Sequence, residues 1–139
     1  MIVAAGLAWY PVLADAGYGV DTKFRQALTD LGLQYVVGIT SSVVVWPPGL
    51  EPLAPLPYVG RGRPPVQPRR SADRQPVSVK TLAMQLPTGA YQMIRWREGT
   101  NAMLSGRFAA VRVRHAGGNA GKARLRAQQC LLVQWPEDE

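Results

Sequence analysis

The sequence predicts an α/β protein, in which a strand-helix-strand unit is followed by a mostly antiparallel β region. Two observations predict this class. β-branched and aromatic runs flank a segment with helical periodicity near the start of the chain, and three strand-like runs separated by turns occupy the last third. A stretch rich in proline and arginine lies between them. We therefore divide the chain into residues 1–45, 46–77 and 78–139.

The first predicted strand spans residues 9–15 and ends in an acidic residue, Asp15. Residues 16–19 (Ala-Gly-Tyr-Gly) are predicted to form a turn. In parallel sheets functional side chains gather at the carboxyl ends of the strands. Asp15 is therefore the candidate functional residue of this region. The alternative is a turn or capping role, for which Asp is also common.

A helix is predicted to begin at Thr22, because Asp21 can serve as its N-cap and apolar residues recur at helical spacing after it. Gly32 suits the left-handed conformation that often ends a helix. The β-branched and aromatic run at residues 33–39 predicts a second strand. Two strands joined through a helix are expected to pair in parallel, with the helix on one face of the sheet.

Most of the prolines fall between Trp46 and Pro76, where regular helix or sheet is not expected. An extended basic segment is predicted, with two interpretations. It could touch a phosphate backbone, since arginine needs little fixed structure for such contacts, or it could be a solvated linker. Its interleaved arginines are Arg61, Arg63, Arg69, Arg70 and Arg74.

Beyond this segment, Ser78 can cap a short helix over residues 79–86, which Pro87 would stop. The turns predicted at residues 98–101 and 115–119 are short, which favours an antiparallel meander. The predicted strands are residues 91–97, 107–114 and 129–135.

Alternation along these strands places basic side chains in pairs. Arg112 and Arg114 share one face of their strand, and Arg95 and Arg97 share one face of theirs. If the two faces align, they form a basic stripe that could bind nucleic acid; a solvated face is the alternative. Trp96 could stack on bases, although a core position is the other interpretation.

The composition limits the remaining function classes. A net charge of +7 and a pI of about 10.2 favour an anionic partner such as nucleic acid, an acidic protein or a membrane surface, or else a plain basic surface. One cysteine, Cys130, and one histidine, His115, cannot build a zinc site or an internal disulfide. Cys130 begins an apolar run, which predicts a buried structural thiol. The apolar start of the chain is too short to span a bilayer and lacks a positive leader, so we expect a cytoplasmic protein.

An ordered set of motifs runs through nearly the whole chain: Val12-Leu13-Ala14-Asp15-Ala16-Gly17-Tyr18-Gly19, Tyr35-Val36-Val37-Gly38, Val45-Trp46-Pro47, Trp96-Arg97-Glu98-Gly99, Arg107-Phe108-Ala109-Ala110-Val111-Arg112-Val113 and Leu131-Leu132-Val133-Gln134-Trp135-Pro136. This set resembles the middle of a bacterial insertion-sequence transposase of the DDE superfamily. The resemblance implies an internal fragment: a partial RNase H-like core followed by a β-rich insertion.

The resemblance also implies an activity and its cofactor. Such enzymes cleave DNA and transfer its strands with three carboxylates that hold two Mg²⁺ or Mn²⁺ ions. Only Asp15 matches, as the second catalytic aspartate and a metal ligand. The first aspartate is expected upstream of Met1 and the glutamate beyond Glu139. Glu98 belongs to a turn of the insertion and is not assigned.

Several expectations follow for the chain on its own. With one carboxylate it should neither hold the metals stably nor cleave DNA. Missing strands should leave a sheet edge and an apolar helix face exposed, giving marginal stability or aggregation. The implied partner is DNA at the transposon ends, bound by Arg95, Arg97, Arg112, Arg114 and Trp96, with a homodimer in the intact protein and no membrane. The implied location is the bacterial cytoplasm, at the nucleoid. The alternatives are a non-catalytic DNA-binding remnant and a pseudogene product without activity.

Overall fold

The computed structural model describes residues 10–65, 69–98, 102–116 and 127–136. The chain forms two compact units, Met1–Val43 and Val44–Glu139. The structure contains both helices and strands, which confirms the mixed α/β class that the sequence predicts. Trp9 of the first predicted strand and the turns at residues 99–101 and 117–119 lie outside the described residues.

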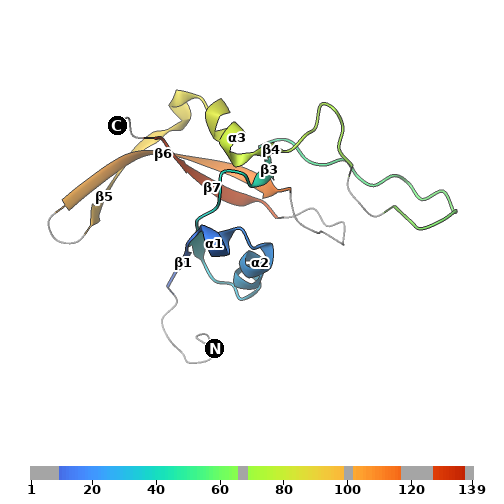
Figure 1. The fold of residues 1–139 in the computed structure, drawn as a ribbon, viewed down its shortest axis with the longest axis horizontal. Helices are drawn as coiled ribbons and strands as arrows, with labels where there is room; N and C mark the ends of the chain where they lie inside the picture. Colours follow the sequence, from blue (N-terminus) through green and yellow to red (C-terminus); the bar gives the residue numbers. More distant parts are fainter. Residues whose placement is uncertain (1–9, 66–68, 99–101, 117–126, 137–139) are drawn as a thin grey trace. The chain divides into compact units, whose positions relative to one another are not determined.

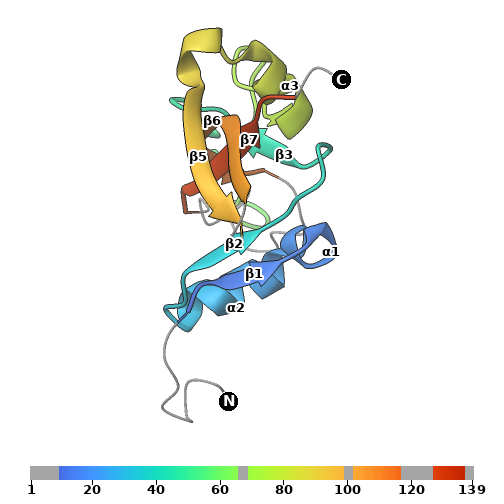
Figure 2. The ribbon, with the colours of Figure 1, turned by 90° about the vertical axis from the view of Figure 1, so that its left-hand side faces the viewer.

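The first unit contains the predicted strand-helix-strand arrangement. Strand β1 (Val12–Ala14) pairs in parallel with β2 (Tyr35–Val37), and Leu13 lies opposite Val36. Between them the chain forms the helices α1 and α2, and α2 lies on one side of the strand pair (Figure 2). The parallel pairing confirms the prediction made from the two strands and their connecting helix.

Helix α1 (Ala16–Gly19) stands where the sequence predicts a turn, so that prediction is wrong. The physical reason is a cap: the Asp15 carboxylate accepts a hydrogen bond from the Gly17 amide, which starts a single helical turn. Gly19 ends this helix in close contact with β2. A Cβ atom added to Gly19 would lie only 1.7 Å from the Gly38 carbonyl oxygen. Glycine is therefore required at this position by the approach of two backbone segments.

Helix α2 (Thr22–Asp30) begins and ends as predicted. Asp21 is its N-cap, accepting a hydrogen bond of 2.8 Å from the Lys23 amide. Just beyond its C-terminus Gly32 adopts a φ of +67°, the left-handed conformation expected there. Leu28 is buried, so the apolar face of the helix contributes to the core of this unit.

The second unit is built on a five-stranded sheet with β6 at its centre (Figure 1). β6 (Ala102–His115) pairs antiparallel with β5 (Gln92–Glu98), with β7 (Gln129–Gln134) and with β3 (Val44–Trp46). The short strand β4 (Val77–Ser78) pairs with β3. The predicted antiparallel meander β5-β6-β7 is confirmed. The sequence does not predict β3 and β4, and β6 begins five residues before its predicted start.

Helix α3 (Val79–Gln85) follows β4, with Ser78 as its N-cap at 3.1 Å from the Thr81 amide, as predicted. The 3₁₀ turn η2 (Thr88–Ala90) follows Pro87. The core of this unit gathers buried apolar side chains from β3, α3, β6 and β7: Val45, Trp46, Leu82, Ala109, Val111, Val113 and Leu131.

Residues 50–76, called the arm below, extend away from this sheet without regular helix or strand in their described part (Figure 1). Leu53 and Arg69 exchange two backbone hydrogen bonds of 2.9 Å, which close the arm near its base. Gly60 and Gly62, both at positive φ, allow the chain to reverse. The extended character matches the prediction for this proline-rich stretch.

Cys130 is exposed on β7, so the prediction of a buried thiol is wrong. Strand alternation explains the difference, since the next residue, Leu131, is the one that faces the core. In the part of the chain that the structure covers, we find no helix with the length and apolar character needed to cross a bilayer.

Candidate functional site

Asp15 lies directly after β1, at the carboxyl end of a strand in a parallel pair. Its side chain is exposed, and Oδ1 accepts a hydrogen bond of 2.9 Å from the Gly17 amide. Asp15 is thus both a strand-end carboxylate and a helix cap. The two interpretations given by the sequence are compatible, because the cap uses only one of the two carboxylate oxygens.

The backbone around Asp15 is tightly packed. The amides of Tyr18 and Gly19 donate to the Asp15 carbonyl oxygen at 3.2 and 2.9 Å, and the Gly38 amide donates to the Ala14 carbonyl at 2.9 Å. A Cβ atom on Gly38 would lie 3.0 Å from the Ala16 nitrogen. Gly19 and Gly38 therefore let α1 approach the end of β2, and the Gly17 amide orients the Asp15 carboxylate.

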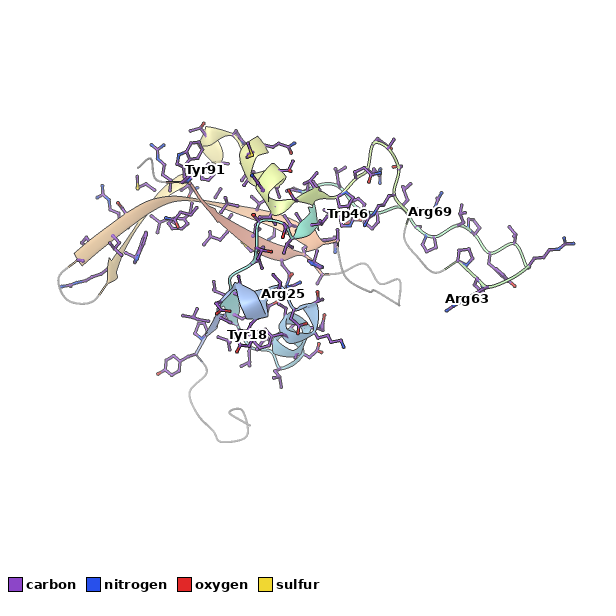
Figure 3. The ribbon with its side chains drawn as sticks, in the orientation of Figure 1. Tyr18, Arg25, Trp46, Arg63, Arg69 and Tyr91 are labelled. Atoms are coloured by element: carbon purple, nitrogen blue, oxygen red, sulfur yellow. The ribbon has the colours of Figure 1, made fainter. Side chains whose placement is uncertain are left out.

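Arg25, on α2, is the buried charged residue among those that the structure describes, at 6% exposure. Its guanidinium group donates hydrogen bonds to the Gly19 carbonyl oxygen and, at 3.4 Å, to Thr22 Oγ1. A cation at the end of a helix is favoured by the partial negative charge of the terminal carbonyls. Figure 3 shows Arg25 and Tyr18 in this unit, and the Tyr18 ring lies 5.7 Å from that of Phe24. Sequence reasoning missed Arg25, since an arginine on a helix usually faces solvent.

The carboxylates in the described ranges do not fit a two-metal centre. A hard cation such as Mg²⁺ needs several oxygen ligands from the protein and water, but no group of three His, Cys, Asp or Glu side chains occurs among the residues described. Asp21 caps α2, and Asp30 accepts a hydrogen bond from Gln26 at 2.8 Å. Glu98 ends β5 in the other unit, opposite Ala102. Among the described residues, Asp15 is thus the one carboxylate that we assign as a candidate metal ligand.

The four arginines predicted to bind DNA lie on strands of the second unit, but not on one face. Arg95 and Arg97 lie opposite Ser105 and Met103, at odd-numbered positions of β6. Arg112 and Arg114 occupy even-numbered positions of β6, whose pairing runs without interruption from residue 102 to residue 113. Because neighbouring residues of a strand point to opposite faces, the two pairs lie on opposite faces. The condition for one continuous basic stripe is therefore not met.

Trp96 lies opposite Leu104 and thus on the same face as Arg112. The residue is 38% exposed, and its ring packs edge-to-face on Phe108, with 5.7 Å between the ring centres. Part of the indole is therefore held in place by the sheet and part is open to solvent. Contact of Trp96 with bases stays a prediction.

Comparison with known protein families identifies the class of protein to which this chain belongs. A family model for the DDE superfamily endonucleases matches residues 1–103, which include Asp15 and the strand-helix-strand unit. The chain belongs to this family. Its members act on DNA and generally use divalent metals. No curated protein and no solved structure matches the chain.

Proposed function

We propose that this chain is part of the catalytic region of a bacterial insertion-sequence transposase, in which Asp15 is one of the carboxylates that bind the divalent metals. The intact protein would cleave DNA and transfer its strands at the transposon ends. The observation that carries the proposal is the place of Asp15, at the carboxyl end of β1 within the part of the chain that matches the family.

The position of the Asp15 side chain supports this role. Its Oδ1 is held by the Gly17 amide, and for Oδ2 the structure records no hydrogen bond to any residue it describes. A carboxylate that is oriented on one side and open on the other can take a ligand without first losing its protein contacts. The remaining carboxylates would come from outside the described residues. We therefore propose that this chain alone lacks nuclease activity, and that the intact protein acts at the nucleoid, as a dimer on paired DNA ends.

Mn²⁺ provides a direct test of Asp15 as a ligand. Paramagnetic broadening of backbone amide signals by Mn²⁺ should be strongest for Gly17 and its neighbours. Asp15→Asn should abolish this broadening and keep the fold, since Asn is as good an N-cap as Asp. Asp21→Asn is the matched control, because Asp21 caps α2 in the same way but does not follow a strand end. Equal broadening in the wild type and in Asp15→Asn would refute the assignment.

The DNA on both sides of the reading frame tests the larger proposal. An in-frame continuation that adds an upstream aspartate and a downstream helix bearing a glutamate, with inverted repeats outside, would support it. Unrelated genes or stop codons at both edges would contradict it.

A non-catalytic DNA-binding protein is the second candidate, favoured by the net charge of +7 and by the lack of a group of three His, Cys, Asp or Glu side chains among the described residues. Under this alternative, binding to a DNA duplex would weaken steeply with salt and would be unchanged in Asp15→Asn. Divalent metal would then have no effect on the complex. A metal-dependent nick made in plasmid DNA by the intact protein, and lost in Asp15→Asn, would exclude it.

A further inference from the structure

The second unit contains a cleft where the arm meets β3 and β6. Its volume is about 180 Å³. Since a water molecule takes up about 30 Å³ of liquid water, the cleft has room for a group of the size of phosphate with some water. It is smaller than the pockets of about 300–1,000 Å³ that hold drug-sized ligands.

Positive charge dominates the lining of this cleft. Arg74 comes from the returning part of the arm, and Arg112 and Arg114 come from β6. Among the described residues, Glu51 is the one carboxylate that lines the cleft, which leaves an excess of two positive charges in this lining. The exposed Asp73 carboxylate adjoins Arg74 in the chain and is attracted to its positive charge, although it does not line the cleft. Positive charges that line one small cleft repel one another, and a bound anion reduces that repulsion.

Glu51 has a defined partner in this arrangement. Its Oε1 accepts a hydrogen bond of 2.9 Å from Nη2 of Arg114, and the Arg114 side chain is only 19% exposed. Arg114 is thereby held in one orientation, next to the buried ring of Trp46, its register partner on β3. Figure 3 shows Trp46 close to where the arm leaves the sheet.

The guanidinium groups of Arg74 and Arg112 form no ion pair among the described residues, although the charge of Arg74 also attracts the exposed Asp73 carboxylate. Both residues are exposed, and the single lining carboxylate is already paired with Arg114. Arg112 lies on the same face of β6 as Arg114, two residues away. The planar fork of arginine matches the oxygens of phosphate, so two such groups from different segments can bind one phosphate from two sides.

We propose that this cleft binds a phosphate group through Arg74 and Arg112, with Arg114 kept in position by Glu51. The phosphate belongs either to the backbone of DNA or to a free phosphate ion, which present the same anionic oxygens. The site goes beyond the role proposed for Asp15 and does not depend on it, because Asp15 belongs to the other unit.

The test compares two arginines of the same strand. Arg112→Gln removes a guanidinium group of the cleft, and Arg107→Gln removes the same charge from an exposed position on the opposite face of β6. Inorganic phosphate and a short DNA duplex are titrated separately into the full chain. Arg112→Gln should weaken binding on the order of tenfold, and for the duplex it should lower the salt dependence by about one ion. Arg107→Gln should change neither by more than about twofold.

The outcomes separate the two sources of phosphate. Weaker binding of both ligands by Arg112→Gln indicates a DNA backbone phosphate, and weaker binding of inorganic phosphate alone indicates a free anion. Equal effects of Arg112→Gln and Arg107→Gln on both ligands would overturn the proposal. Neither result bears on Asp15, which the Mn²⁺ experiment tests by itself.

A measurement on the wild-type chain tests the same proposal without relying on variants that could fail to fold. Cys130 lies directly opposite Arg112 on β7 and is exposed. Phosphate bound in the cleft should slow modification of this thiol by a bulky maleimide, relative to chloride at the same ionic strength. An unchanged rate at phosphate concentrations that saturate the titration would also overturn the proposal.

Discussion

Leu13 on β1 and Val36 on β2 lie directly opposite each other in the parallel strand pair, and both side chains are exposed, at 77% and 61%. They share the face opposite to that of Val12, Ala14, Tyr35 and Val37, whose side chains are half-buried. Adjacent exposed apolar side chains on a strand pair with open edges form a surface prone to association.

We therefore predict that the isolated chain self-associates, and that Leu13→Thr combined with Val36→Thr shifts it toward the monomer. Threonine keeps the β-branched shape that strands favour while removing apolar surface. Sedimentation velocity at several concentrations measures the change. Val59→Thr is the control, because Val59 is 85% exposed and belongs to the arm of the second unit. A wild-type chain that stays monomeric and unfolds in one cooperative transition would contradict the prediction.

Gly19→Ala should destabilise the first unit. The added methyl group would lie 1.7 Å from the Gly38 carbonyl oxygen, so the backbone of α1 or β2 must move. Overpacking of this kind costs about 1–3 kcal/mol. Amide hydrogen exchange at Gly38, whose N–H donates to Ala14, reports the loss directly.

The matched control is Gly89→Ala in η2, where an added Cβ meets no atom within 4 Å. Alanine there should be neutral or stabilising by up to about 1 kcal/mol, because it restricts the unfolded chain. Similar losses of protection in the two variants would show that Gly19 is not at a close backbone contact.

Arg25→Leu should also weaken the first unit, by about 1–3 kcal/mol, because it leaves the Gly19 carbonyl oxygen without its buried donor. Lys23→Leu, a change of the same charge on the exposed side of α2, should cost much less. Denaturant unfolding followed by circular dichroism gives both free energies. Equal costs for the two substitutions would mean that the buried hydrogen bond does not stabilise α1.

Cys130 should react with a thiol reagent in the folded chain at a rate close to that of a model thiol. The expectation follows from its exposed position on β7. Absorbance of released thionitrobenzoate measures the rate, and Cys130→Ser supplies the blank. A reaction that requires denaturant would show that another surface covers this strand.

The elements that sequence reasoning predicted best depend on local signals. Asp21, Gly32 and Ser78 determine where helices begin or end through hydrogen bonds and backbone angles within a few residues. α1 escaped prediction because the same residue types, Asp followed by Gly, serve both a turn and a cap. Asp15 could be singled out because it follows a short apolar run.

The features that could not be predicted depend on pairing between distant segments. β3 and β4 are defined by partners far along the chain, at His115 for one and at Val44 for the other. The register between β5 and β6 decides whether Arg95 shares a face with Arg112, and a shift by one residue would reverse the answer. Alternation within one strand contains no information about this register.

The backbone bridge between Leu53 and Arg69 joins the two sides of the arm, so that a change at its tip need not be transmitted to the sheet. The chain between these residues begins and ends at one fixed point, so its length can change without moving either β3 or β4. Doubling such a loop adds only about 0.6 kcal/mol of closure entropy. The tip of the arm is therefore a place where insertions, deletions or a fused tag can be accommodated, while the cleft at its base keeps its shape.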